Sequence, residues 1–146
     1  MSVAAAAKAA LVGTSGVLAP LLPGVTVSYS APRDLPRELV YGGQVVGPVA
    51  LAAMAGGVRV KRSEELTLQL HVRVYQPGAT TTETTDARAV VIGDTIAAYI
   101  AGATLLGGVT DLKLAQVSGV DLDGWVDDDG AGSTLTLAVG LMSYLT

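Results

Sequence analysis

The chain contains a single histidine, His71, and its imidazole is the side chain best suited to acid–base chemistry near neutral pH. One histidine in a chain without cysteine cannot form a typical zinc site, which takes several nitrogen or sulfur ligands. His71 alternates with apolar residues, so a strand here would carry Arg73 and Tyr75 on the same face. These three residues are the first candidates for an enzymatic site, but we interpret His71 as a surface or interface residue and expect no enzyme.

Carboxylates are concentrated in one segment near the end of the chain, which contains five aspartates: Asp121, Asp123, Asp127, Asp128 and Asp129. Calcium takes several oxygen ligands from such residues, but the spacing of an EF-hand loop and its closing glutamate are absent. The adjacent Glu64 and Glu65 give no sign of the two acids that a glycosidase holds apart across a cleft. We therefore predict a solvated acidic loop from Asp121 to Gly132 and no metal site.

Two glycine-rich segments, Gly13–Gly16 and Tyr41–Gly43, are the remaining candidates for a ligand site. Neither has the strand-to-helix context or the lysine of a phosphate-binding loop. The absence of cysteine excludes a disulfide, a thiolate nucleophile and a thiolate-bound metal. We expect neither a catalytic site nor a cofactor.

The overall composition indicates one globular domain that spans residues 1–146. Apolar residues make up 50% of the chain but aromatic residues only 4%, so the core must consist of valine, leucine, isoleucine and alanine. A net charge of −4 argues against an electrostatic grip on nucleic acid, which requires lysine and arginine. The apolar opening from Val3 to Leu22 contains Lys8 and several helix breakers, so we expect neither a signal peptide nor a membrane span.

The first half of the chain alternates between helix and strand signals. Ser2 is a candidate cap for an alanine-rich helix over Val3–Val12, and β-branched residues predict a strand over Val25–Ser30. The segment Tyr41–Gln44 fits a tight hairpin. The clearest strand is Arg62–Tyr75, because apolar and polar residues alternate along it. Its expected buried face consists of Leu66, Leu68, Leu70, Val72 and Val74.

The second half begins with a long helix. Thr80 and Glu83 have the spacing of a capping box and predict the start of an amphipathic helix over Thr84–Ala103. A strand over Leu112–Val120 should then pair antiparallel with a final strand over Leu135–Leu145. The predicted fold class is α+β: a mixed, mainly antiparallel β-sheet packed by one long amphipathic helix, with an N-terminal helix and a C-terminal β-hairpin.

Two segments have the character of a protein–protein contact. The first carries Arg33, Leu35 and Arg37, where charges surround apolar residues as at the rim of an interface, although a plain exposed loop fits equally well. The second consists of three apolar residues: Val49, Leu51 and Met54. These side chains are unfavourable in water and would be buried by a neighbouring copy, so we predict an assembly interface here.

The order of these elements resembles that of the tail terminator proteins of long-tailed, noncontractile (siphovirus-type) phages of actinobacteria. The resemblance covers nearly the whole chain and rests on pattern rather than on a diagnostic motif. The segments that carry it are Val3–Val12, the strand Arg62–Tyr75 with the following Pro77-Gly78, the helix Thr84–Ala103, and the terminal pair Leu112–Val120 and Leu135–Leu145.

The resemblance implies a structural protein of the virion, assembled in the host cytoplasm and located at the junction of head and tail. Such a protein forms a hexameric ring that stops polymerisation of the tail tube protein and joins the tail to the head-completion proteins. It has no catalytic residues and no cofactor. DNA would pass through the lumen of the ring without specific binding, and an acidic lining at Asp127, Asp128 and Asp129 would suit this passage.

Other functions fit the same sequence. A head–tail connector or a tail tube subunit would share the assembly role, although the predicted helices disfavour a tube subunit built mainly of strands. A small-ligand-binding α+β module is an alternative from another class, because a sheet covered by a helix can enclose an apolar pocket.

Overall fold

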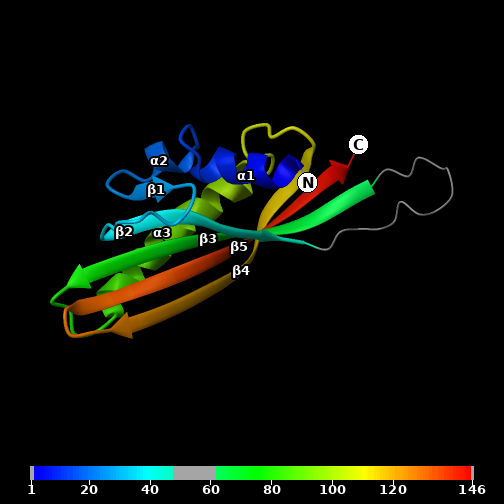
Figure 1. Ribbon diagram of the computed structural model, residues 1–146. Helices are drawn as coiled ribbons and strands as arrows, with labels where there is room; N and C mark the ends of the chain where they lie inside the picture. Colours follow the sequence, from blue (N-terminus) through cyan, green and yellow to red (C-terminus); the bar gives the residue numbers. More distant parts are fainter. Residues whose placement is uncertain (1, 48–61, 146) are drawn as a thin grey trace.

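Five strands form one sheet in the computed structural model, which describes residues 2–47 and 62–145 (Figure 1). The elements in chain order are α1 (Ser2–Val12), α2 (Leu18–Leu21), β1 (Thr26–Ser28), β2 (Glu38–Val46), β3 (Arg62–Pro77), α3 (Glu83–Gly102), β4 (Leu112–Val126) and β5 (Gly130–Leu145). The strand order is β1-β2-β3-β5-β4; β1 pairs parallel with β2, and all other neighbours pair antiparallel. The predicted mixed, mainly antiparallel α+β fold is therefore confirmed.

The core lies between the sheet and the helices that cover one of its faces. The predicted alternation in β3 is confirmed, because all five of its apolar residues are buried. They pair with buried β5 residues, as in Leu68 with Val139 and Leu70 with Leu137. Helix α3 adds Ile92 to this core, and each such side chain contributes about 1.5–3 kcal/mol relative to exposure.

Helix α3 lies close to the sheet because one of its residues lacks a side chain. A Cβ atom on Gly93 would come within 2.4 Å of the Leu135 Cδ2 atom on β5. The helix packs against β3, β5 and β4, whereas α1 packs on β2 and β3. The helix side of the sheet is therefore covered along its middle by α3 and at one end by α1.

The start of α3 differs from the predicted capping box. The cap residue is Thr82, which makes no side-chain cap hydrogen bond, so the pairing of Thr80 with Glu83 was wrong. The Thr82 hydroxyl instead donates to Asp86 one turn along the helix, at 3.1 Å. Any of several neighbouring threonines could have begun the helix, and the contact with Asp86 favours Thr82.

Strand β2 runs continuously through the segment in which a hairpin was predicted. Glu38–Gly42 and Val45–Val46 pair with β3, and a register irregularity lies between Gly42 and Val45. A Cβ atom on Gly42 would meet the side chains of Lys8 and Val12 on α1. Gly42 therefore permits close approach of α1, and the hairpin prediction was wrong because this glycine serves packing.

The acidic segment is mostly strand, so the predicted loop over Asp121–Gly132 was wrong in extent. Strand β4 continues to Val126, and only residues 127–129 connect it to β5. Asp121 and Asp123 pair with β5 residues in regular register. Their exposure resembles that of loop residues because β4 lies at the edge of the sheet and these side chains point to its uncovered face. The first strand is also shorter than predicted, at Thr26–Ser28.

Candidate functional site

The face of the sheet opposite the helices, here called the open face, carries His71 in the middle of β3. Its neighbours across the sheet are Tyr41 on β2 and Thr136 on β5. The His71 Nδ1 atom lies 3.0 Å from the Thr136 hydroxyl, and the His71 and Tyr41 rings are 4.9 Å apart. Partial burial lowers the pKa of His71, because desolvation disfavours the charged imidazolium. These contacts orient the imidazole within a packed surface.

Arg73 lies between two aromatic rings on the same open face. Its guanidinium is 5.7 Å from the Tyr75 ring centre and 5.3 Å from that of Trp125. The predicted clustering of His71, Arg73 and Tyr75 on one face is thus confirmed, whereas Trp125 was missed. Trp125 belongs to β4 and reaches this cluster across Gly132, where a Cβ atom would overlap the indole. The contact of Trp125 with this cluster can be recognised only from the pairing register of the strands.

The phenol of Tyr75 has a raised pKa, which desolvation causes first and the nearby Asp127 and Asp129 carboxylates increase. Tyr75 is therefore a neutral phenol at neutral pH. Among the described residues, Thr136 is the one hydrogen-bond partner of the His71 ring, and no carboxylate reaches it. In the described part of the open face, aromatic rings lie beside the Arg73 guanidinium, and no carboxylate is paired with His71.

A buried polar network fixes the first turn of α3 to β5. The Thr85 and Ser133 hydroxyls are hydrogen-bonded at 2.7 Å, and Ser133 also donates to the Asp86 carboxylate. Since Ser133 gives its proton to Asp86, Thr85 supplies the proton between the two hydroxyls. The Thr82 carbonyl, 3.0 Å from the Thr85 oxygen, is the other acceptor for that proton. Thr85 and Ser133 are fully buried, so the network positions the helix and is inaccessible to a substrate.

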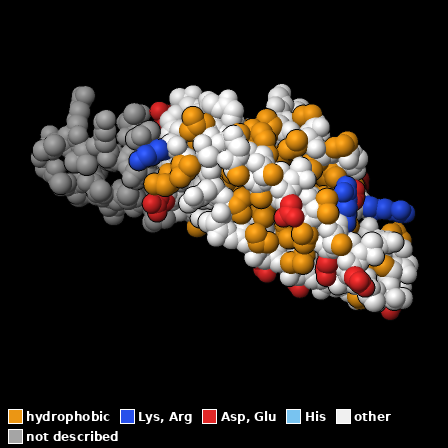
Figure 2. Space-filling model, turned by 180° about the vertical axis from the view of Figure 1, so that it is seen from behind, with side chains coloured by type: hydrophobic (Ala, Val, Ile, Leu, Met, Phe, Trp, Pro, Cys, Tyr) orange, Lys and Arg blue, Asp and Glu red, His pale blue; other side chains and the backbone are white. Residues whose placement is uncertain are grey.

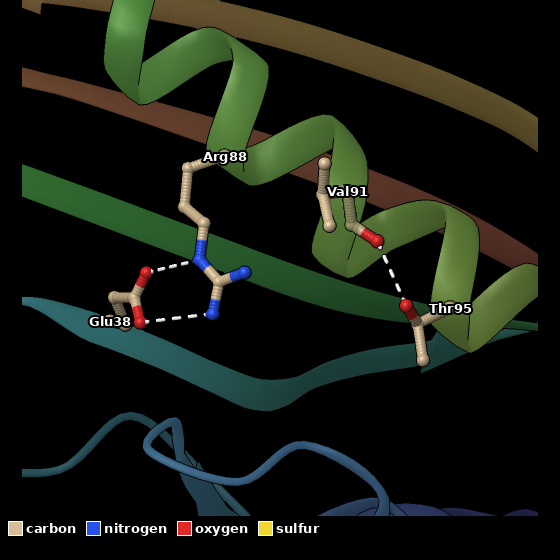
Figure 3. A network of polar contacts seen from close by, with 4 residues as sticks. All are labelled: Glu38, Arg88, Val91 and Thr95. Atoms are coloured by element: carbon tan, nitrogen blue, oxygen red, sulfur yellow. Dashed lines mark hydrogen bonds and ion pairs between the residues drawn. The ribbon is translucent and has the colours of Figure 1, made fainter.

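An ion pair between α3 and β2 stands beside this network (Figure 3). Arg88 donates two hydrogen bonds to the Glu38 carboxylate, one of them at 3.2 Å. The hydrogen bond with Glu38 raises the pKa of Arg88. One turn further along the helix, the Thr95 hydroxyl donates to the Val91 carbonyl and stays within α3 (Figure 3). The charge of Arg88 is thus largely satisfied within the fold.

An open pocket of about 470 Å³ lies where β1, β2, β3 and the start of α3 meet. The ion pair of Glu38 and Arg88 lines it together with Arg37, Gln76 and Thr84. Its size suits a small ligand, but most of its lining residues are charged or polar, whereas ligand pockets are lined mainly by apolar residues.

The predicted interface residues Arg33, Leu35 and Arg37 all lie in the segment between β1 and β2, and all three are exposed. Leu35 is 53% exposed, which is unusual for a leucine. The other predicted interface residues, Val49, Leu51 and Met54, lie outside the described residues. One of the two interface segments is therefore placed at the surface.

The three predicted lumen residues form the turn of the β4–β5 hairpin. Asp127 accepts hydrogen bonds from the backbone N–H groups of Asp129 and Gly130, at 2.9 and 2.8 Å. Asp127 therefore shapes the turn, as aspartate commonly does. Asp128 and Asp129 are exposed at the tip, where two free carboxylates face solvent.

Exposed apolar side chains that were not predicted lie on the helix side of the molecule. They belong to valines and a leucine on the outer face of α3 and on β4: Val90, Val91, Val120, Leu122 and Val126. Val120 is 64% exposed and Val91 54% exposed. Figure 2 shows apolar side chains spread across this face with few charged groups between them. We call these five residues the apolar outer surface.

Residues 2–47 and 62–145 contain no cluster of three histidine, aspartate or glutamate side chains that could hold a metal ion. Within the same residues, no helix is long and apolar enough to cross a membrane. No protein-family model matches the chain, and no curated protein matches it. The physical character of the surfaces must therefore guide a functional proposal.

Proposed function

We propose that this chain is a structural virion subunit, a phage tail terminator that forms a ring on the head-proximal end of a noncontractile tail tube. The observation that carries the proposal is the apolar outer surface, which lies beside an edge strand of 15 residues. A long edge strand with exposed apolar side chains favours association with another chain. Such a surface suits a subunit of an assembly better than a protein that works alone.

The order of elements gives further support. An N-terminal helix, a sheet, one long helix on that sheet and a C-terminal hairpin are the features on which the resemblance to tail terminators rests. In this proposal the ring contacts the tail tube protein on one side and the head-completion protein on the other. The exposed carboxylates of Asp128 and Asp129 would face the lumen, because acidic groups repel the phosphates of passing DNA.

The proposal includes no enzymatic activity, and the contacts of the candidate catalytic side chains agree with it. Among the described residues, His71 is hydrogen-bonded to Thr136 and no carboxylate contacts its ring, and the hydroxyl of Ser133 is buried. We therefore propose a mechanical function without cofactor or catalysis, located in the virion.

A head–tail connector or a tail tube subunit would use the same apolar outer surface, and both remain alternatives within the assembly class. A small-ligand-binding module is the alternative from another class, and the open pocket beside Arg37 is the observation that favours it. A thermal shift produced by a small anionic ligand in a chain that never assembles would support this alternative.

The test is to add the purified chain to tail tube protein of the same phage during polymerisation, and to image the products by negative-stain electron microscopy. A terminator is expected to form rings, to bind one end of each tube and to shorten the tubes. Incorporation along the tube wall would instead indicate a tube subunit. Tubes of unchanged length with bare ends would contradict the proposal.

A further inference from the structure

The two edges of the sheet differ in length and in charge. Strand β4 forms one edge with 15 residues, and β1 forms the other with only three. Beyond register irregularities at its start, β4 pairs regularly with β5 from Gly119 to Val126. The outward backbone groups of this stretch have no strand beside them in the sheet, so they can pair with an additional chain.

Side chains on the edge strand alternate between apolar and acidic. Val120 and Leu122 are exposed on the helix side, while Asp121 and Asp123 are exposed on the open face. Neither aspartate forms an ion pair or a side-chain hydrogen bond with a described residue. A partner for this edge should therefore carry both apolar and positively charged groups.

The segment Arg33–Arg37 at the opposite end of the sheet, here called the basic segment, has these properties, because its two exposed arginines outnumber the one exposed carboxylate of Asp34. Leu35 is half exposed, and Arg33 and Arg37 are exposed on either side of it. The other arginines with described side chains are engaged, because Arg73 lies between aromatic rings and Arg88 binds Glu38. Arg33 and Arg37 have no ion pair with a described residue.

We propose that the β4 edge of one copy, from Gly119 to Val126, docks against the basic segment of a second copy. Asp121 and Asp123 would face Arg33 and Arg37, while apolar side chains pack around Leu35. The proposal rests on the proposed ring in one respect, since it takes the partner to be another copy of this chain.

Charge also decides the orientation of this contact. Symmetric pairing of two β4 edges would place the aspartates of one copy near those of the other, and like charges on adjacent strands are destabilising. A contact between the β4 edge of one copy and the basic segment of another copy is head-to-tail. It leaves one free β4 edge and one free basic segment on every pair of copies. Further copies can add to these edges, and a closed ring forms when the rotation between copies allows it.

A charge exchange tests the contact. Asp121→Arg/Asp123→Arg reverses the acidic edge, and Arg33→Asp/Arg37→Asp reverses the basic segment. Each variant alone is expected to remain monomeric at concentrations where the wild type associates, as measured by light scattering at low salt. An equimolar mixture should recover the wild-type mass, because every edge then meets an oppositely charged segment. Asp128→Arg/Asp129→Arg is the matched control and should associate like the wild type.

Disulfide trapping extends the test to an association too weak for light scattering. The chain has no cysteine, so Leu35→Cys and Val120→Cys introduce unique thiols. Mixing these two variants under oxidation should give more disulfide-linked dimer than mixing Leu35→Cys with Leu105→Cys, because Leu105 is 46% exposed and lies outside the apolar outer surface. Equal yields in both mixtures would overturn the proposal, as would unchanged association of the folded charge-reversed variants.

The failure of this contact is distinguishable from the failure of the ring function. If each charge-reversed variant, used alone, still forms rings that cap tubes, the contact is refuted and the terminator function stands. Specific trapping of Leu35→Cys with Val120→Cys in a chain that never binds tubes would support the contact and refute the terminator function.

Discussion

Strand β3 and the second half of β4, from Gly119 to Val126, show the same alternation, yet they occupy opposite environments. In β3 the apolar side chains lie under α3 and between paired neighbours, and Leu70 is fully buried. In β4 the corresponding positions on the helix side hold Val120 and Leu122, which are 64% and 40% exposed. Alternation therefore identifies a strand and its apolar face, but not whether another element covers that face. For β4 we propose that a partner covers the apolar face that the described residues leave exposed.

The largest expected difference between the two strands comes from shortening a leucine in each. Leu70→Ala should lower the free energy of unfolding by about 2–5 kcal/mol, because it leaves a cavity in a packed core. Leu122→Ala should change the free energy of unfolding of the monomer by less than about 0.5 kcal/mol. Urea denaturation of both variants measures the two effects. Equal losses would show that β4 is covered within the monomer, contrary to this comparison.

A smaller effect should come from the close approach that lets α3 cover β3. Gly93→Ala should destabilise the fold by about 1–3 kcal/mol through contact with Leu135, and a helix propensity gain of up to about 1 kcal/mol should offset part of this loss. Gly102→Ala is the matched control in the same helix, since a Cβ atom there meets nothing within 4 Å. Thermal unfolding should separate the two variants, and a Gly93→Ala variant as stable as Gly102→Ala would show that the helix can move away at little cost.

The smallest effect concerns pH and the open face of β3. Burial lowers the pKa of His71 below its ordinary value of 6.5, so the unfolded chain binds more protons than the folded chain just below that pH. The contribution of His71 to stability is therefore complete above pH 6.5 and declines as the pH falls through the lowered pKa. Denaturation curves at several pH values should show this decline in the wild type and less of it in His71→Gln. Parallel profiles for the two proteins would contradict the burial of this ring.

Local signals in the sequence were sufficient for the inner part of the fold. The alternation in β3 and the helical spacing of α3 reflect burial within the chain, so the pattern and the structure agree. The edge was less predictable, because Asp121 and Asp123 are as exposed as loop residues although they belong to a strand. Likewise, Gly42 has the appearance of a turn residue, and only its contact with α1 explains why it lies inside a strand.

Among the surface features, too, some were predictable from local sequence and others were not. The exposure of Arg33, Leu35 and Arg37 was predictable from their mixed charge and the prolines around them. The contact of Trp125 with Arg73 and the exposed row on β4 were not, because both depend on strand order and register. Strand order and register are properties of the whole sheet, so the residues nearby in the sequence do not indicate them.

The central claim is that the apolar outer surface is a protein contact in an assembly. Light scattering across a concentration range should test it with two leucines that are each 40% exposed, Leu122 on β4 and Leu21 on α2. We predict that the wild type and Leu21→Asp reach the mass of a closed ring, whereas Leu122→Asp remains a folded monomer. A wild type that stays monomeric at every concentration and in the presence of tail tube protein, or a Leu122→Asp variant that assembles like the wild type, would contradict the claim.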